Sequence, residues 1–287
     1  MSWEALSAEL DRWVVTGRRP TLWWRDDGVI AWSPALYRLL EVTEAGPVPL
    51  ALAVPPGLAE SRLAGRLARA RRVSVLQHGV TARNRAPAGS PPSEFPGTRD
   101  AAEMAAETCR GWLQLAELFG RQARPYFVPP WNRADPAFLD GLGQLGFRGL
   151  SRAGPRAEGA TDSPGPMQVN AHVDPLGVDP LGVDPLGVDP LGPAPGVART
   201  DSFAGEDVVL AALIGHLAAR RRGEVDPDEP TGLLTHHREL DPPAWAFLER
   251  LVAHTTAHPT VRWLAADVAF APPSAVGNYL RALPTVR

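Results

Sequence analysis

Two adjacent aspartates and two separate histidines are the residues of this chain best suited to chemistry. Asp26, Asp27, His78 and His236 each follow a short apolar run of the kind that forms a buried strand. Where two carboxylates stand side by side, one can hold a divalent cation while its neighbour acts as a base. His78 can add an imidazole ligand, and His236 can protonate a leaving group. Together these groups could drive the attack of a metal-bound water on a carbonyl.

Two further expected strands end in, or are followed by, polar and aromatic residues that could bind a substrate. Trp131 and Asn132 follow two prolines, which make a rigid turn, and an aromatic ring in such a turn can stack on a sugar. His172 ends another expected strand, 168–172. We therefore assign Pro130, Trp131, Asn132 and His172 to substrate binding.

Short β-rich runs alternate with helical patterns along the chain and must position these side chains. We expect strands at 21–25, 50–54, 73–77, 125–128, 147–151, 168–172, 232–235 and 261–264, with helices between them. Seven or eight strands that alternate with helices predict parallel βα units, which right-handed crossovers curl into a barrel or an open sheet. We favour an α/β fold with a single distorted (β/α)7-8 barrel, because its rim would gather the polar strand ends.

The chain divides into a helix, the barrel and a tail. Residues 1–18 form an amphipathic N-terminal helix, with apolar residues spaced three and four apart. The barrel spans 19–272, and 273–287 is a C-terminal tail. Residues 173–192 are four copies of Val-Asp-Pro-Leu-Gly, which we expect to be an expanded surface loop inserted in the barrel. The alternative is a metal-binding repeat that uses its four aspartates.

Composition excludes several classes of protein. The 44% hydrophobic and 21% charged residues rule out a disordered chain. A net charge of −3 provides no basic field for nucleic acid or a membrane surface, and all 29 cationic residues are Arg, which rules out lysine chemistry. No apolar stretch reaches the ~18 residues of a membrane span. With a single cysteine and no signal-peptide pattern at the start, we expect a soluble cytoplasmic protein.

The order of these motifs resembles a known family. Asp26-Asp27-Gly28, His78-Gly79, Pro129-Pro130-Trp131-Asn132 and Leu233-Leu234-Thr235-His236 are similar to the motifs of the polysaccharide deacetylases of the NodB-homology type, carbohydrate esterase family 4, over about residues 20–270. The resemblance implies a NodB-like distorted barrel, a divalent metal (zinc is expected) and removal of acetyl from an N-acetylated sugar.

The resemblance also implies a role for each matched residue. Asp26 matches the general base, Asp27 the metal-binding aspartate, His78 the first metal histidine and His236 the general acid. Pro130 and Trp131 match the segment that shapes the substrate groove.

The chain departs from the family at the metal site. Ala82 stands where the family has a second metal histidine, and Arg83 and Arg85 place positive charge beside it. The site is one ligand short of the usual three protein ligands of a catalytic zinc, and His172 or Asp174 is a candidate replacement.

Three hypotheses follow from these residues. The first is a divergent metal-dependent deacetylase that acts on a small or carbohydrate substrate. The second is a catalytically inactive deacetylase-like barrel that binds a glycan or a protein, although the sequence specifies no protein partner. The third is an unrelated βα-barrel hydrolase that acts on another C–N bond.

Overall fold

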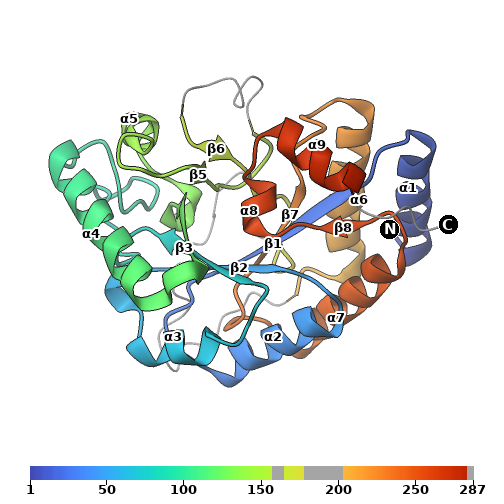
Figure 1. Ribbon diagram of the computed structural model, residues 1–287, viewed down its shortest axis with the longest axis horizontal. Coiled ribbons are helices and arrows are strands. Elements are labelled where there is room, and N and C mark those ends of the chain that lie inside the picture. Colours follow the sequence, from blue (N-terminus) through green and yellow to red (C-terminus); the bar gives the residue numbers. More distant parts are fainter. Residues whose placement is uncertain (157–164, 178–202, 283–287) are drawn as a thin grey trace.

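Parallel strands form the centre of the molecule, and helices surround them (Figure 1). The structure is a computed structural model that describes residues 1–156, 165–177 and 203–282. The strands within these residues are β1 (Thr21–Asp27), β2 (Leu50–Val54), β3 (Val73–His78), β4 (Ala123–Val128), β5 (Gly149–Leu150), β6 (Met167–Gln168), β7 (Thr231–Thr235) and β8 (Arg262–Trp263). The longer helices are α1 (Trp3–Val15), α2 (Pro34–Ala45), α3 (Ser61–Leu67), α4 (Ala101–Phe119), α5 (Pro136–Gly141), α6 (Glu206–Arg222), α7 (Pro242–Ala257) and α9 (Pro273–Ala282), and a short α8 covers Ala266–Ala269.

The strands run in the order β6-β5-β4-β3-β2-β1-β7, all pairs are parallel, and β8 also pairs with β1. Beyond β6 the chain stays extended, and Val173 forms a parallel bridge with Leu233 of β7. This bridge joins the two outer strands, so that the sheet curls into a distorted barrel. The predicted α/β barrel is therefore confirmed.

Closure of the barrel depends on a glycine in β7. A Cβ atom on Gly232 would lie 2.2 Å from the carbonyl oxygen of Asn170 and 2.5 Å from Nε1 of Trp23. These two groups also contact each other, since Trp23 Nε1 donates to the Asn170 oxygen at 2.9 Å. Only glycine lets the two backbones and the indole approach this closely.

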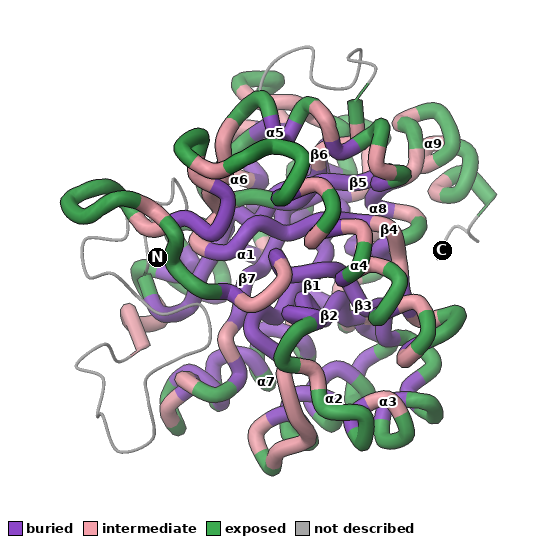
Figure 2. Tube along the Cα trace, turned by 90° about the vertical axis from the view of Figure 1, so that its left-hand side faces the viewer, coloured by how far each residue is buried: buried purple, intermediate pink, exposed green. Residues whose placement is uncertain are grey.

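The alternation of side chains along β1 separates two apolar regions. Trp23 packs inside the barrel against small residues of β2, Tyr126 and Phe270. Leu22 and Trp24 point the other way and pack beneath the surrounding helices. All seven residues of β1 are buried, and Figure 2 shows buried strands at the centre with exposed segments around them. Because side chains alternate along a strand, consecutive residues at the end of β1 must also face opposite ways.

Local signals explain where several helices begin. The side chain of Ser33 accepts a hydrogen bond from Leu36 N, and Pro34 occupies the first helical position of α2. Helix α1 lies on α6 with Trp3, Leu6, Leu10 and Trp13 buried, as the spacing predicted. The predicted tail is helical from residue 273 to residue 282.

The first copy of the repeat is not a surface loop, which corrects the prediction for Val173–Gly177. Val173, Asp174 and Leu176 are buried, because the bridge from Val173 to β7 makes this copy part of the barrel wall. The remaining copies, at 178–192, lie outside the described residues.

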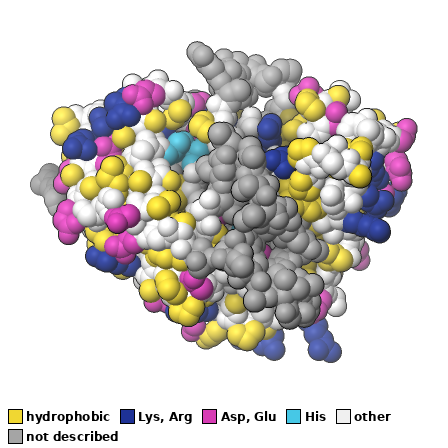
Figure 3. Space-filling model, turned by 180° about the vertical axis from the view of Figure 1, so that it is seen from behind, with side chains coloured by type: hydrophobic (Ala, Val, Ile, Leu, Met, Phe, Trp, Pro, Cys, Tyr) yellow, Lys and Arg dark blue, Asp and Glu magenta, His cyan; other side chains and the backbone are white. Residues whose placement is uncertain are grey.

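The described residues contain no helix long and apolar enough to cross a membrane. Arginine and acidic side chains both occur across the face shown in Figure 3, outside the parts drawn in grey. This mixture is consistent with the small net charge.

Candidate functional site

The parallel strands bring the predicted catalytic side chains to one end of the barrel. Asp26 pairs in register with Thr235, the last residue of β7, and His78 is the last residue of β3. His236 follows β7 directly. We call this end, where β1, β3 and β7 finish, the mouth.

Asp26 is bound by the end of β7. Its Oδ2 atom accepts hydrogen bonds from Thr235 Oγ1 at 2.6 Å and from the backbone N–H of His237 at 3.0 Å. The ring Nδ1 of His237 lies 2.6 Å from Oδ1 of Asp26. All three residues are buried, so that the carboxylate has its partners inside the protein. His237 is therefore the histidine that binds Asp26, whereas His236, the predicted general acid, does not contact it by a hydrogen bond among the described residues.

Asp27 is bound by Arg25, two residues before it on the same face of β1. Nε of Arg25 lies 2.8 Å from Oδ1 of Asp27, and Nη2 donates to Oδ2 at 3.0 Å. The same guanidinium donates to Ser151 Oγ at 2.6 Å, to the Arg152 carbonyl at 3.2 Å and to Asn132 Oδ1 at 2.8 Å. Arg25 is completely buried, and its Nη1 and Nη2 atoms have hydrogen-bond partners, whereas its Nε and Oδ1 of Asp27 share only the ion contact.

The two aspartates have different partners, and their roles as base and metal ligand stay predictions. Because both belong to β1 rather than to the loop after it, their side chains face opposite sides of the strand. Asp26 meets β7, whereas Asp27 meets Arg25 inside the barrel.

His78, His236 and Asp174 form the buried electrostatic environment around Asp27. Burial lowers the pKa of His78 to about 4, although the nearby Asp27 opposes this shift. Burial raises the pKa of Asp174 to about 6. Burial disfavours charge on His236, but Asp174 and Glu239 outweigh this effect and raise its pKa. Near neutral pH, His78 is therefore neutral.

Several polar atoms in this group are buried without a hydrogen-bond partner. They are both ring nitrogens of His78, Nδ1 of His236 and Oδ2 of Asp174. Burying such atoms costs about 1–3 kcal/mol each, so they are poised to bind a polar ligand or water.

The segment that follows His78 is held by Glu94 and is not helical. The Glu94 carboxylate accepts from the backbone N–H groups of Val80 (3.0 Å), Thr81 (2.8 Å) and Ala82 (3.2 Å). Ala82 is buried with a φ of 52°. This conformation is unusual for a residue other than glycine, and it fixes the position where the resemblance would place a second metal histidine.

The turn after β4 lies beside Arg25. Trp131 and Asn132 both have a φ of 55°, and Trp131 is partly exposed. Asn132 accepts from Arg25, as described above, and buried Pro130 lies under Gly79. The structure therefore brings Pro130, Trp131 and Asn132 to the mouth.

His172 lies elsewhere. Its Nδ1 accepts from the backbone N–H of Gly232 at 2.9 Å, and its Nε2 lies 3.4 Å from a carboxylate oxygen of Glu229. The ring stacks on His216 with centroids 3.6 Å apart. Burial lowers the pKa of both histidines. These partners belong to the beginning of β7, away from the mouth, and they give His172 a structural setting rather than a place in the site.

The side chains at the mouth do not fit the expected metal centre as they are arranged. Among the described residues, no group of three or more His, Cys, Asp or Glu side chains is placed to hold a metal ion. Both oxygens of Asp27 are bound by a cation, Arg25, and Ala82 offers no ligand. A catalytic zinc usually takes three protein ligands.

Sequence reasoning missed the partners that bind the two aspartates. Arg25 stands directly before the two aspartates and received no predicted role, although the spacing of two along a strand places it beside Asp27. Nothing local in the sequence indicates that Glu94 binds the segment after His78. For the adjacent pair His236 and His237, nothing local indicates which of the two binds Asp26.

No family model matches the sequence, and no curated protein matches it. Solved structures do match the fold. A putative polysaccharide deacetylase from Mycobacterium smegmatis superposes with a TM-score of 0.58 at 16% identity, over 94% of this chain and 94% of that one. The Bc1960 peptidoglycan N-acetylglucosamine deacetylase superposes with a TM-score of 0.52 at 12% identity, over 91% of this chain and 96% of that one. The chain therefore has the barrel fold of the polysaccharide deacetylases, which confirms the fold implied by the motifs.

Proposed function

We propose that this chain is a deacetylase-like barrel that binds a carbohydrate at its mouth without hydrolysing it, and that Arg25 takes the place of the metal. The observation that carries this proposal is the buried ion pair between Arg25 and both oxygens of Asp27. A metal ion would have to displace a guanidinium that is also bound to Ser151 and Asn132.

The cost of that displacement supports the proposal. Separating a buried ion pair leaves an uncompensated charge and typically costs about 3–5 kcal/mol. The gain in return would be small, because Ala82 supplies no ligand and the backbone around it is held by Glu94.

The mouth offers the chemistry that sugars need. Hydroxyl groups both donate and accept, so they suit the unpartnered atoms of His78, His236 and Asp174. Trp131 is partly exposed beside Asn132, and an aromatic ring there can stack on a sugar ring. The named likeness to a peptidoglycan N-acetylglucosamine deacetylase makes an N-acetylated sugar the first ligand to test.

A metal-dependent deacetylase is the second candidate, and His78 favours it. Metal binding requires a neutral imidazole, and burial lowers the pKa of His78 to about 4. In this case His78 and Asp27 would be ligands, zinc would be the expected metal, and Asp26 and His236 would act as base and acid. Asp174, not His172, would be the candidate for the third position.

Calorimetric titration with N-acetylglucosamine tetramer tests binding. We expect saturable binding that weakens about ten-fold or more in Trp131→Ala, since stacking contributes about 1–3 kcal/mol. Tyr279→Ala removes an exposed aromatic from α9, far from the mouth, and should leave the affinity unchanged. Absence of binding, or equal loss in both variants, would contradict the proposal.

Zinc titration and acetate release separate the two candidates. We expect no stoichiometric zinc binding and no acetate from the tetramer. Acetate release that requires zinc and disappears in Asp26→Ala would establish the deacetylase instead. We also propose that the ligand is a small or precursor sugar met in the cytoplasm, and cell fractionation that finds the protein outside the membrane would overturn this.

A further inference from the structure

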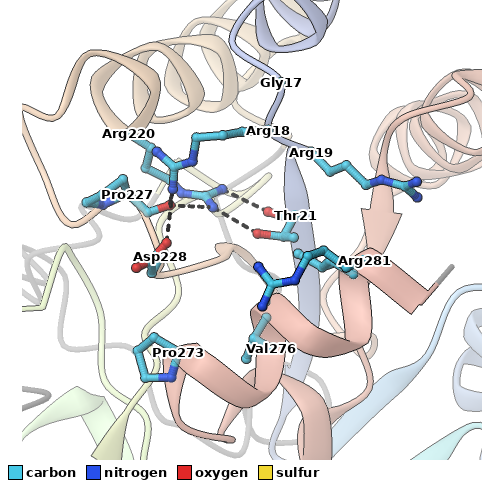
Figure 4. A pocket seen from close by; sticks show the side chains of 12 residues that line it. Gly17, Arg18, Arg19, Thr21, Arg220, Pro227, Asp228, Pro273, Val276 and Arg281 are labelled. Atoms are coloured by element: carbon cyan, nitrogen blue, oxygen red, sulfur yellow. Dashed lines mark hydrogen bonds and ion pairs between the residues drawn. The ribbon is translucent and has the colours of Figure 1, made fainter. Parts of the chain in front are cut away.

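A cavity lies at the opposite end of the barrel from the mouth. It measures about 460 Å³ and lies between the start of β1, the end of α6, the loop at 227–228 and helix α9 (Figure 4). Thr21, the first residue of β1, lines it, whereas Asp27 ends that strand. At about 3.3 Å per residue, the cavity is about 20 Å from the mouth.

The charge of this cavity is strongly positive. Four arginines line it, namely Arg18, Arg19, Arg220 and Arg281, against a single carboxylate, Asp228. Although the net charge of the protein is −3, four of its 29 arginines line this one cavity.

The guanidinium of Arg220 is buried and bonds to neutral oxygen atoms, with the carboxylates of Glu229, Asp228 and Asp226 nearby. It donates to the Thr21 carbonyl at 2.9 Å, to Thr21 Oγ1 at 2.8 Å and to Thr231 Oγ1 at 3.0 Å. Burial lowers the pKa of Arg220 to about 9, which still leaves it charged at neutral pH. The Arg220 guanidinium is therefore a charged part of the cavity wall.

Arg18 brings a second guanidinium to the same point. It donates to the Pro227 carbonyl at 3.0 Å, and Arg220 donates to this same oxygen at 3.2 Å (Figure 4). Asp228 binds Arg18 at 3.0 Å and offsets one of the two charges. Two cations on one carbonyl repel each other, and an anion beside them would relieve that repulsion.

Helix α9 forms the facing wall. Arg281 projects from this helix into the cavity (Figure 4). Its Nη2 donates to Oδ1 of Asn278 at 2.7 Å. Pro273, Val276 and Leu280 of the same helix add apolar surface. The cavity therefore combines guanidinium groups on both sides with an apolar wall.

We propose that this cavity binds an organic phosphate, with the phosphate between Arg18 and Arg281 and the apolar body of the ligand against α9. A phosphate carries more charge and more acceptor oxygens than a carboxylate, and it can engage two guanidinium groups at once. This site is separate from the mouth and does not rest on the function proposed there.

Calorimetric titration with phenyl phosphate tests the site, with benzoate, phenol and inorganic phosphate as comparison ligands. We expect one phenyl phosphate per chain, bound about ten-fold more tightly than benzoate or inorganic phosphate, and no binding of phenol. Higher salt should weaken binding, because the attraction is electrostatic. Inorganic phosphate that binds as tightly as phenyl phosphate would overturn the role of the apolar wall.

Arg281→Ala tests the location. This residue is exposed on α9, so the variant should fold normally and bind phenyl phosphate about ten-fold more weakly. Arg110→Ala removes an exposed arginine from α4, on the other side of the barrel, and should leave binding unchanged. Lack of saturation up to about 10 mM, or equal affinity in wild type and Arg281→Ala, would overturn the proposal.

Discussion

The two ends of the barrel differ in how their charged groups are paired. At the mouth, Asp26 and Asp27 are each bound by buried internal partners. At the other end, Arg220 bonds to neutral oxygens with carboxylates only nearby, and guanidinium groups outnumber carboxylates among the residues that line a cavity.

A chain can therefore keep a catalytic motif while the aspartates of that motif are already bound to other groups of the protein. In barrels of this kind, active sites lie where strands end, and the opposite face usually serves stability. Here the two motif aspartates at the mouth are part of an internal network, and arginines outnumber carboxylates around a cavity at the face where stability is expected. Variants at both ends can break or sharpen this contrast.

Arg25→Ala should have the largest effect. It removes the partner of a buried carboxylate and several further hydrogen bonds, so we expect a loss of about 3–5 kcal/mol in the free energy of unfolding. Urea denaturation measures this. Adding Asp27→Ala should recover part of the loss, because no buried charge then remains unpaired. A double variant no more stable than the single one would show that the ion pair is not the cause.

Glu94→Gln should cost less, about 2 kcal/mol, because an amide nitrogen would replace an oxygen that accepts from backbone N–H groups. The loop after His78 should loosen, which hydrogen exchange of Val80, Thr81 and Ala82 would detect. The exposed Glu103→Gln on α4 is the matched control. Unchanged exchange in Glu94→Gln would contradict the role given to this carboxylate.

His216→Phe should alter the pH dependence of stability. Burial lowers the pKa of His216 in the folded state, so below about pH 6.5 the unfolded chain takes up the proton first and the folded state loses stability. Phenylalanine keeps the stacking on His172 and cannot be protonated. At pH 7.5 the variant should be about 1 kcal/mol less stable than the wild type, because it lacks the hydrogen bond to Thr231. At pH 5 protonation of unfolded His216 lowers the stability of the wild type by up to about 2 kcal/mol, so the deficit of the variant should vanish or reverse.

Urea denaturation of both proteins at the two pH values measures the difference. Burial raises the pKa of Asp174 to about 6, so acidification also stabilises the folded state through this residue. Because Asp174 is present in both proteins, its contribution cancels in the comparison. Parallel pH profiles for wild type and variant would mean that His216 does not titrate on unfolding.

Arg281→Ala should have the smallest effect on stability, within about 0.5 kcal/mol, because its side chain is exposed. Thermal unfolding would measure this. A loss comparable with that of Arg25→Ala would mean that arginines at both ends serve the fold, and the contrast between the ends would disappear.

Part of this molecule could be predicted from residues close together in the sequence. Apolar runs, caps such as Ser33 with Pro34, and the alternation of strands with helices were sufficient for the parallel barrel. The same runs placed Asp26, Asp27, His78 and His236 at one end, because parallel strands finish on the same side.

Only the tertiary structure decided which groups these side chains meet. The bonds of Arg25 to Ser151 and of Asp26 to His237 join residues more than 100 positions apart, and nothing local specifies them. The first repeat copy, read as a loop from its Pro and Gly, became barrel wall because Val173 found Leu233. The arginine cavity likewise exists only because the end of α6 and helix α9 both lie beside the start of β1. Sequence pattern determined the elements, whereas charge pairing and burial, which depend on distant contacts, determined the state of each site.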